Sequence, residues 1–112
     1  MTALTGKQRA CLRAQANGLG AILHVGKEGL SHNLIKQAGD ALTARELIKG
    51  CILETAPLTA REAAEKLSAA TGSLTVQVIG RRFVLYRENP DLPADKRRLP
   101  RERAIDTRAR KP

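Results

Sequence analysis

The chain has 112 residues, a length that suits one domain with an appendage. It carries 20 Lys and Arg against 11 Asp and Glu, a net charge of +9, and this excess favours a nucleic acid as partner over a merely basic soluble surface. Because no apolar run approaches the ~20 residues that span a membrane, and the first residues lack a secretion signal, we expect a cytoplasmic protein.

The first half of the chain predicts a helix, a strand and a second helix. Thr5 and Gln8 have the spacing of a capping box, so a helix should begin there and end at Asn17. The short apolar run over residues 21–25 is typical of a buried strand. Apolar residues then recur at helical spacing: Leu34, Ile35, Ala38, Ala41 and Leu42.

The loop between that strand and the second helix holds two glycines three positions apart, Gly26 and Gly29. Neither has a Cβ, so the backbone can turn tightly and lie close to a bulky partner. Lys27 adds a positive charge, and Ser31 can cap the next helix so that its first N–H groups point toward the loop. This combination suits a phosphodiester backbone, as in the GxxG loop of KH modules, although an ordinary tight turn would have the same sequence.

The second half predicts strand, helix and hairpin. Residues 47–53 are predicted to form a strand, and the capping box Thr59–Glu62 begins a helix that Gly72 ends. Residues 75–79 and 83–86 are rich in β-formers and are joined by a short turn, which predicts a hairpin. The order α-β-α-β-α-β-β predicts a compact α/β sandwich with a mixed four-stranded sheet.

Composition changes after residue 88. Residues 1–88 hold 12 basic and 7 acidic side chains, or +5, and residues 89–112 hold 8 and 4, or +4. Residues 89–112 contain four of the five prolines and few large apolar groups, so we expect a disordered basic tail after a domain of residues 1–88. Its cations would hold any polyanion loosely. They are Lys96, Arg97, Arg98, Arg101 and Arg103.

Four sequence blocks resemble the chloroplast RNA splicing and ribosome maturation (CRM) domain family, in particular its free-standing bacterial YhbY-like branch. The blocks are Thr5-Gly-Lys-Gln-Arg, Val25-Gly-Lys-Glu-Gly-Leu, Glu46-Leu-Ile-Lys, and Val76-Gln-Val-Ile-Gly-Arg with Val84-Leu-Tyr-Arg. The resemblance covers about residues 4–87. It implies a fold similar to the C-terminal domain of bacterial translation initiation factor three. It also implies RNA binding without catalysis or cofactor, on ribosomal RNA in precursors of the large ribosomal subunit.

The resemblance places the RNA contact on the loop formed by Gly26, Lys27, Glu28 and Gly29, next to Ser31. The acidic Glu28 would lower the affinity for a phosphate backbone slightly, and Gly50, where a β-branched residue is more usual, would loosen its strand. Further cations extend the expected contact surface, although each also fits a solvated surface. These cations are Lys7, Arg9, Arg13, Lys49, Arg81 and Arg82.

Other readings of the sequence remain open. A P-loop enzyme is disfavoured, because Gly20 is six rather than five residues before Gly26 and Glu28 takes the Ser/Thr position. A protein–protein adaptor on ribosomal particles is a second alternative, and a DNA-binding protein a third. Single Cys and His residues predict no metal site, and Cys11 and Cys51 are expected to be buried free thiols. We expect Phe83 in the core, whereas Tyr86 could pack or stack on a base. A monomer is the expected state.

Overall fold

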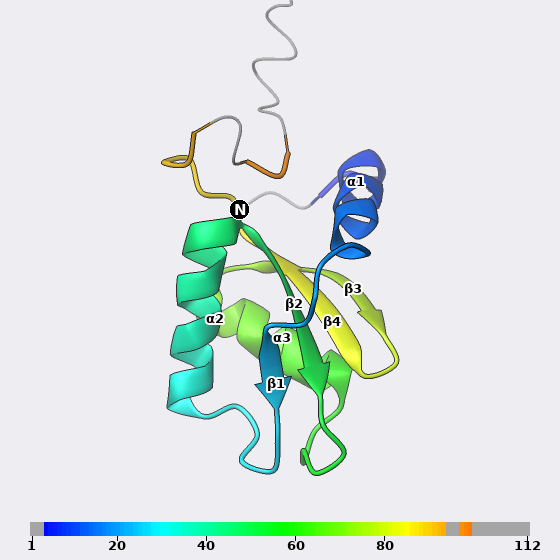
Figure 1. Cartoon of the computed structure of the whole chain (residues 1–112), viewed down its shortest axis with the longest axis vertical. Coiled ribbons are helices and arrows are strands. Elements are labelled where there is room, and N and C mark those ends of the chain that lie inside the picture. Colours follow the sequence, from blue (N-terminus) through cyan, green and yellow to red (C-terminus); the bar gives the residue numbers. More distant parts are fainter. Residues whose placement is uncertain (1–3, 94–96, 100–112) are drawn as a thin grey trace, which may run out of the picture.

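In the computed structural model, which describes residues 4–93 and 97–99, helices and strands follow in the predicted order (Figure 1). They are α1 Gly6–Ala16, β1 Leu23–Val25, α2 His32–Arg45, β2 Leu47–Ile52, α3 Ala60–Thr71, β3 Leu74–Ile79 and β4 Arg82–Tyr86. The predicted boundaries lie within about two residues of the observed ones, except that α2 continues to Arg45, three residues past the last apolar position predicted for it. The α/β class and the order of elements are therefore confirmed.

The four strands form one mixed sheet in the order β1-β2-β4-β3. β1 runs parallel to β2, whereas β4 pairs antiparallel with both β2 and β3. The predicted hairpin is present, with Ile79 opposite Arg82 and Gly80 in the turn at φ 57°. The mixed four-stranded sheet is confirmed.

Local capping interactions set the ends of the helices. Thr5 and Thr59 each form a complete capping box, with Gln8 and Glu62 as the reciprocal partners. Gly72 ends α3 in the left-handed conformation, at φ 72°. These interactions involve residues only three or four positions apart, which explains why the sequence predicted them.

The helices cover the two faces of the sheet unequally. α2 and α3 pack on one face, where the main core contains Leu23, Leu42, Ile48, Leu67 and Phe83. α1 packs on the opposite face near one end, over a smaller core that contains Leu12, Leu47, Val84, Tyr86 and Leu99. The rest of that second face is left uncovered by α1, and we call it the open face.

Gly50 allows the largest core side chain to cross β2. A Cβ built on Gly50 would lie 2.2 Å from Cζ of Phe83, which is directly opposite on β4 and has no solvent exposure. Glycine is therefore required at this position by the packing of Phe83, whereas the expectation that it loosens the strand stays a prediction. The Phe83 ring occupies the space that a side chain at position 50 would need.

The segment after residue 88 contacts the domain wherever the structure describes it. Glu46, fully buried at the end of α2, accepts hydrogen bonds from the backbone N–H groups of Asn89 (2.6 Å) and Arg98 (2.7 Å). The side chain of Arg97 is only 4% exposed, and Leu99 joins the smaller core. The buried carboxylate of Glu46 thus ties the described part of this segment to the domain at Asn89 and Arg98, and the expectation of a disordered tail over residues 89–112 stays a prediction.

Two side-chain expectations are settled by burial. Phe83 lies in the core as predicted, and Tyr86, only 4% exposed, packs in the smaller core and is not available for stacking.

Both cysteines are free, but Cys11 is exposed and Cys51 half-buried, so the prediction of buried thiols is wrong. Within the described residues, no helix is long and apolar enough to cross a membrane.

Candidate nucleic-acid interface

The loop after β1 is a tight turn with a cation in its middle. The backbone N–H of Gly29 donates to the carbonyl of Gly26 at 2.9 Å, which closes the turn. Lys27 and Glu28 are the two central residues, and both are exposed. Their side chains have no hydrogen bond or ion pair among the described residues. The ammonium group of Lys27 is therefore available to an external anion.

The two glycines contribute differently to this turn. Gly29 has φ 67°, a backbone conformation that favours glycine, although a Cβ there would make only an ordinary contact of 3.5 Å with Cγ of Pro57. Gly26 has an ordinary φ, and its Cβ would make a normal contact of 3.7 Å with Leu53 Cδ1. Only the second glycine is required by the backbone conformation.

The N-terminus of α2 follows directly. Ser31 caps it by accepting from the backbone N–H of Leu34 at 3.2 Å, as its position predicted. The first N–H groups of a helix lack acceptors within the helix and carry its partial positive charge. A hollow of about 290 Å³ lies here, and its lining is His24, Gly26, Lys27, Glu28, Gly29, Ser31 and Leu34.

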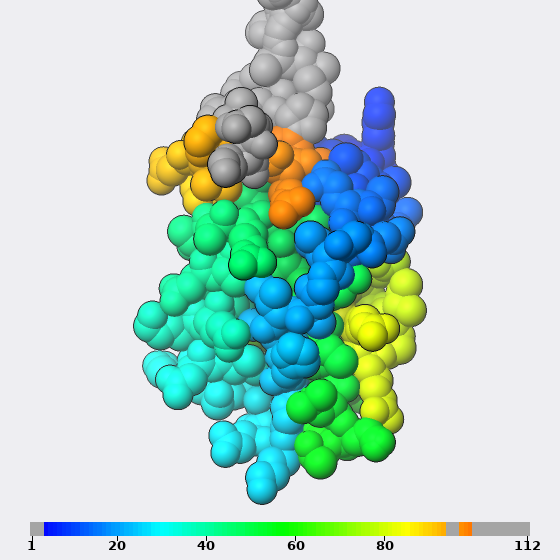
Figure 2. Space-filling view, in the orientation of Figure 1, coloured from blue at the N-terminus to red at the C-terminus, as the bar shows by residue number. Residues whose placement is uncertain are grey.

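Further cations lie at the same end of the sheet. The Gly80-Arg81 turn lies beside the end of β2, where the N–H of Ile52 donates to the carbonyl of Arg81 at 2.7 Å. Arg81 and Arg82 are both exposed. Figure 2 shows the cyan loop around residues 26–30 and the green loop around residues 53–57 projecting together from the lower end. Glu28 and Glu54 place carboxylates at this end as well, so it is not uniformly positive.

The open face carries a row of side chains that the sequence did not bring together. The strand register aligns His24 with Cys51, Cys51 with Arg82, and Arg82 with Ile79. Ile79 is 63% exposed, and His24 is exposed between two fully buried neighbours. We did not predict His24 as a contact, although its outward position in the alternating run Leu-His-Val was a usable signal. The row adds polar and apolar surface beside Arg82.

The predicted cations of the first helix lie apart from the loop. α1 packs over the starts of β2 and β3, at the opposite end of the sheet from residues 26–29. Arg9 donates from Nη1 to the carbonyls of Thr75 and Val76, both at 2.8 Å. Its guanidinium therefore binds β3 at the β-bulge, where the register with β4 shifts. Lys7 is exposed and Arg13 half-buried. Arg9 therefore supports the fold, and its predicted contact with RNA stays a prediction.

Lys49 lies on the open face, between the cations near the glycine loop and those of α1. It is half-buried, on the same face of β2 as Leu47 and Cys51, and opposite Val84.

Of the predicted tail contacts, Arg97 is corrected, because its buried guanidinium pairs with Glu46 and Glu88 and cannot hold a polyanion loosely. Arg98 is half-buried against the domain. Lys96, Arg101 and Arg103 lie outside the described residues.

The chemistry available here is electrostatic. Cationic side chains and the N–H groups of a helix start can bind phosphate oxygens and fix the register of a nucleic acid. Among residues 4–93 and 97–99, no group of three or more His, Cys, Asp or Glu is placed to hold a metal ion.

Comparison with known proteins identifies a family. The model of the CRS1/YhbY (CRM) domain matches residues 4–87. A Bacillus subtilis relative named "Probable RNA-binding protein YqeI" is 44% identical over 88 residues, which is 79% of this chain and 92% of the relative. A Haemophilus influenzae relative named "RNA-binding protein" is 33% identical over 106 residues, 91% of this chain and 100% of the relative.

Two further proteins extend the comparison. "Probable RNA-binding protein MJ0652" of Methanocaldococcus jannaschii is 41% identical over 86 residues, 75% of this chain and 63% of the relative. The solution structure of SAV1595 from Staphylococcus aureus is 46% identical, covers 80% of this chain and 93% of its own, and superposes with a TM-score of 0.67. The likeness therefore holds in both sequence and fold.

Proposed function

Because the chain belongs to the CRS1/YhbY (CRM) domain family, we propose that it binds RNA, and that its target is ribosomal RNA in precursors of the large ribosomal subunit. Relatives whose names state RNA binding cover most of this chain. The net charge of +9 agrees with a polyanionic partner. The proposed activity is binding without catalysis, in the cytoplasm, during assembly of the subunit.

The observation that carries the proposal is the position of Lys27 at the tip of the Gly26–Gly29 turn, directly before the start of α2. In the proposed mechanism, the ammonium group takes one phosphate. The backbone of the turn and the first N–H groups of α2 approach the next. Arg81 and Arg82 extend the contact over the open face. RNA would be recognised by its shape and backbone rather than by its base edges.

Two other functions make different predictions. An adaptor that binds an acidic ribosomal or assembly protein would remain on ribosomal particles after nuclease treatment. A nucleotide-binding enzyme would bind ATP tightly in the presence of Mg²⁺. Neither has a specific contact in the described structure to support it, whereas the loop and helix start suit a phosphate backbone.

The test is binding of the full chain to labelled large-subunit ribosomal RNA, with transfer RNA and duplex DNA of equal length as competitors. We expect ribosomal RNA to compete at least tenfold better than duplex DNA. Sedimentation of the chain with large-subunit precursors, before and after nuclease treatment, is the companion measurement. Equal competition by DNA, or association that resists nuclease, would contradict the proposal.

A further inference from the structure

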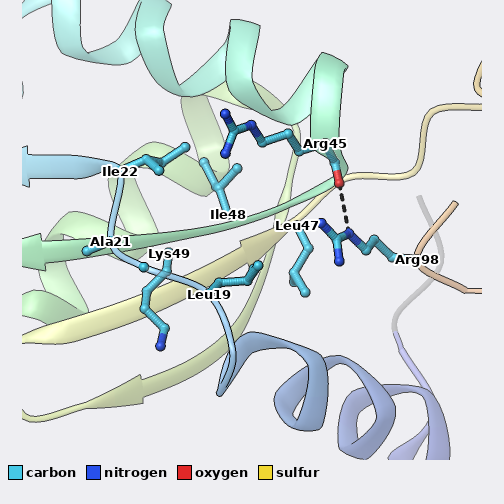
Figure 3. A pocket seen from close by; sticks show the side chains of 9 residues that line it. Leu19, Ala21, Ile22, Arg45, Leu47, Ile48, Lys49 and Arg98 are labelled. Atoms are coloured by element: carbon cyan, nitrogen blue, oxygen red, sulfur yellow. Dashed lines mark hydrogen bonds between the residues drawn. The ribbon is translucent and has the colours of Figure 1, made fainter. Parts of the chain in front are cut away.

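A second hollow lies at the opposite end of β1 from the glycine loop. It is formed between the segment that joins α1 to β1 and the start of β2, and its volume is about 160 Å³ (Figure 3). We call it the linker pocket. It exists because β1 pairs with β2 only from Leu23 opposite Gly50, which leaves the first residues of β2 beside an irregular segment. Its lining is Leu19, Gly20, Ala21, Ile22, Arg45, Leu47, Ile48, Lys49 and Arg98.

All of the ionisable side chains that line this pocket are cationic: Arg45, Lys49 and Arg98. The side chains of Arg45 and Lys49 form no hydrogen bond or ion pair among the described residues. Lys36 on α2 is different, because its ammonium group is paired with Asp40 at 3.1 Å. The pocket therefore concentrates three cationic side chains, and the nearby carboxylate of Glu46 binds the backbone N–H of Arg98 rather than any of these side chains.

Arg98 is held in place by neutral acceptors. Its Nε donates to the carbonyl of Arg45 at 3.2 Å, as Figure 3 shows, and its Nη1 donates to Oε1 of Gln15 at 3.4 Å. Its backbone N–H is fixed by Glu46 at 2.7 Å. A guanidinium held by neutral groups keeps its charge available, and its planar fork suits phosphate oxygens.

We propose that the linker pocket binds a second phosphate of the RNA backbone, through Lys49, Arg45 and Arg98. This inference rests on the proposed function and adds a contact to it. A volume of about 160 Å³ would hold roughly five waters at ~30 Å³ each, so the pocket can take a hydrated phosphate. The apolar wall formed by Leu19, Ala21 and Ile22 fits the sugar beside it. Because Arg98 is supplied by the C-terminal segment, that segment completes the pocket.

The pocket and the glycine loop flank the same short strand. Ile22 precedes β1 and Gly26 follows it, four residues apart, which corresponds to roughly 13 Å at the rise of a strand. A few consecutive nucleotides could therefore contact both places. Two anchoring points on one RNA would fix its direction across the open face.

The test compares two double variants of the full chain on labelled large-subunit ribosomal RNA. Arg45→Gln with Lys49→Gln removes two pocket cations. Lys36→Gln with Arg61→Gln removes the same charge from exposed positions on α2 and α3. We expect the pocket variant to bind at least tenfold more weakly than the control variant. The slope of log affinity against log salt should fall in magnitude by about 0.7 to 0.9 more than in the control, because one phosphate contact is lost. Lys49→Arg, which keeps the charge, should bind nearly as the unchanged chain does.

Other outcomes distinguish this inference from the function on which it rests. If ribosomal RNA binds and Lys27→Gln weakens it, but the two double variants behave alike, the pocket is not an RNA site and the proposed function stands. If the pocket variant keeps its affinity for naked RNA but leaves ribosomal particles, an acidic protein occupies the pocket and the inference fails. If the unchanged chain does not bind ribosomal RNA, both proposals fail. Unfolding midpoints in urea establish that each variant is folded.

Discussion

The carboxylate of Glu46 and the backbone N–H of Arg98 meet at 2.7 Å, although the residues are 52 positions apart. Glu46 has no solvent exposure and adopts φ 64°, a conformation that is uncommon outside glycine. Its oxygens also accept from Asn89 and lie 3.9 Å from the guanidinium of Arg97. One buried side chain thus joins the end of α2 to the segment after β4.

Replacing Glu46 by Gln should destabilise the fold by about 3 kcal/mol. The amide removes the charge opposite the buried Arg97 and turns one acceptor into a donor that faces an N–H group. Urea denaturation measures the free energy of unfolding, and Glu54→Gln, at an exposed loop position, is the matched control. A loss no greater than that of the control would mean that Glu46 does not hold the C-terminal segment.

Adding a methyl group at Gly50 should cost about 3 kcal/mol of stability, because the new Cβ would overlap the ring of Phe83. Gly39→Ala is the opposite control. It lies inside α2 with nothing within 4 Å of its Cβ, so it should stabilise the protein by about 0.5 to 1 kcal/mol. In a Phe83→Leu background the cost of Gly50→Ala should shrink. Equal costs in both backgrounds would contradict the proposed overlap.

Tyr86 should make stability depend on pH in the alkaline range. Burial, with smaller contributions from the negative charges of Glu46 and Glu88, raises the pKa of Tyr86 from 10 to about 12. The unfolded chain then loses the phenolic proton near pH 10 while the folded chain keeps it. The stabilisation present below pH 10 is therefore lost as the pH rises to 12, by at most about 2 to 3 kcal/mol.

Comparison with Tyr86→Phe isolates this effect from the titration of lysines. The free energy of unfolding of the unchanged chain should fall more steeply between pH 10 and 12 than that of the variant. Parallel pH profiles for the two proteins would show that the phenol titrates alike in the folded and unfolded states.

The two loop glycines should respond differently to alanine. Gly29→Ala forces a side chain into φ 67° and should cost about 1 to 2 kcal/mol, whereas Gly29→Asn should cost less. Gly26→Ala has an ordinary backbone conformation and only a normal contact, and should change stability by less than about 0.5 kcal/mol. Thermal unfolding measures all three. Equal losses at both positions would be inconsistent with the observed turn.

Features decided by neighbouring residues could be predicted from the sequence. The capping boxes at Thr5 and Thr59 and the left-handed Gly72 depend on residues a few positions away, and all three are present. The glycine turn and the Ser31 cap were predicted for the same reason. The likeness to the initiation-factor domain and the assignment of RNA contacts remain predictions.

Features that depend on strand order or on distant partners could not be predicted in this way. Arg97 in a sequence rich in proline and charge looks solvated, and its burial depends on Glu88, Asn89 and the distant Glu46. Gly50 looked like a weak point because its partner, Phe83, lies on a different strand. The alignment of His24 with Arg82 through Cys51 requires β2 to lie between β1 and β4, an order that local patterns do not specify.

The central claim is that Lys27 at the tip of the glycine turn contacts an RNA phosphate. The most direct test is the salt dependence of affinity for large-subunit ribosomal RNA, measured for the unchanged chain, Lys27→Gln and Arg61→Gln. One lost phosphate contact should lower the magnitude of the log–log slope by about 0.7 to 0.9 for Lys27→Gln and leave it nearly unchanged for Arg61→Gln on α3. Identical slopes for the two variants would contradict the claim.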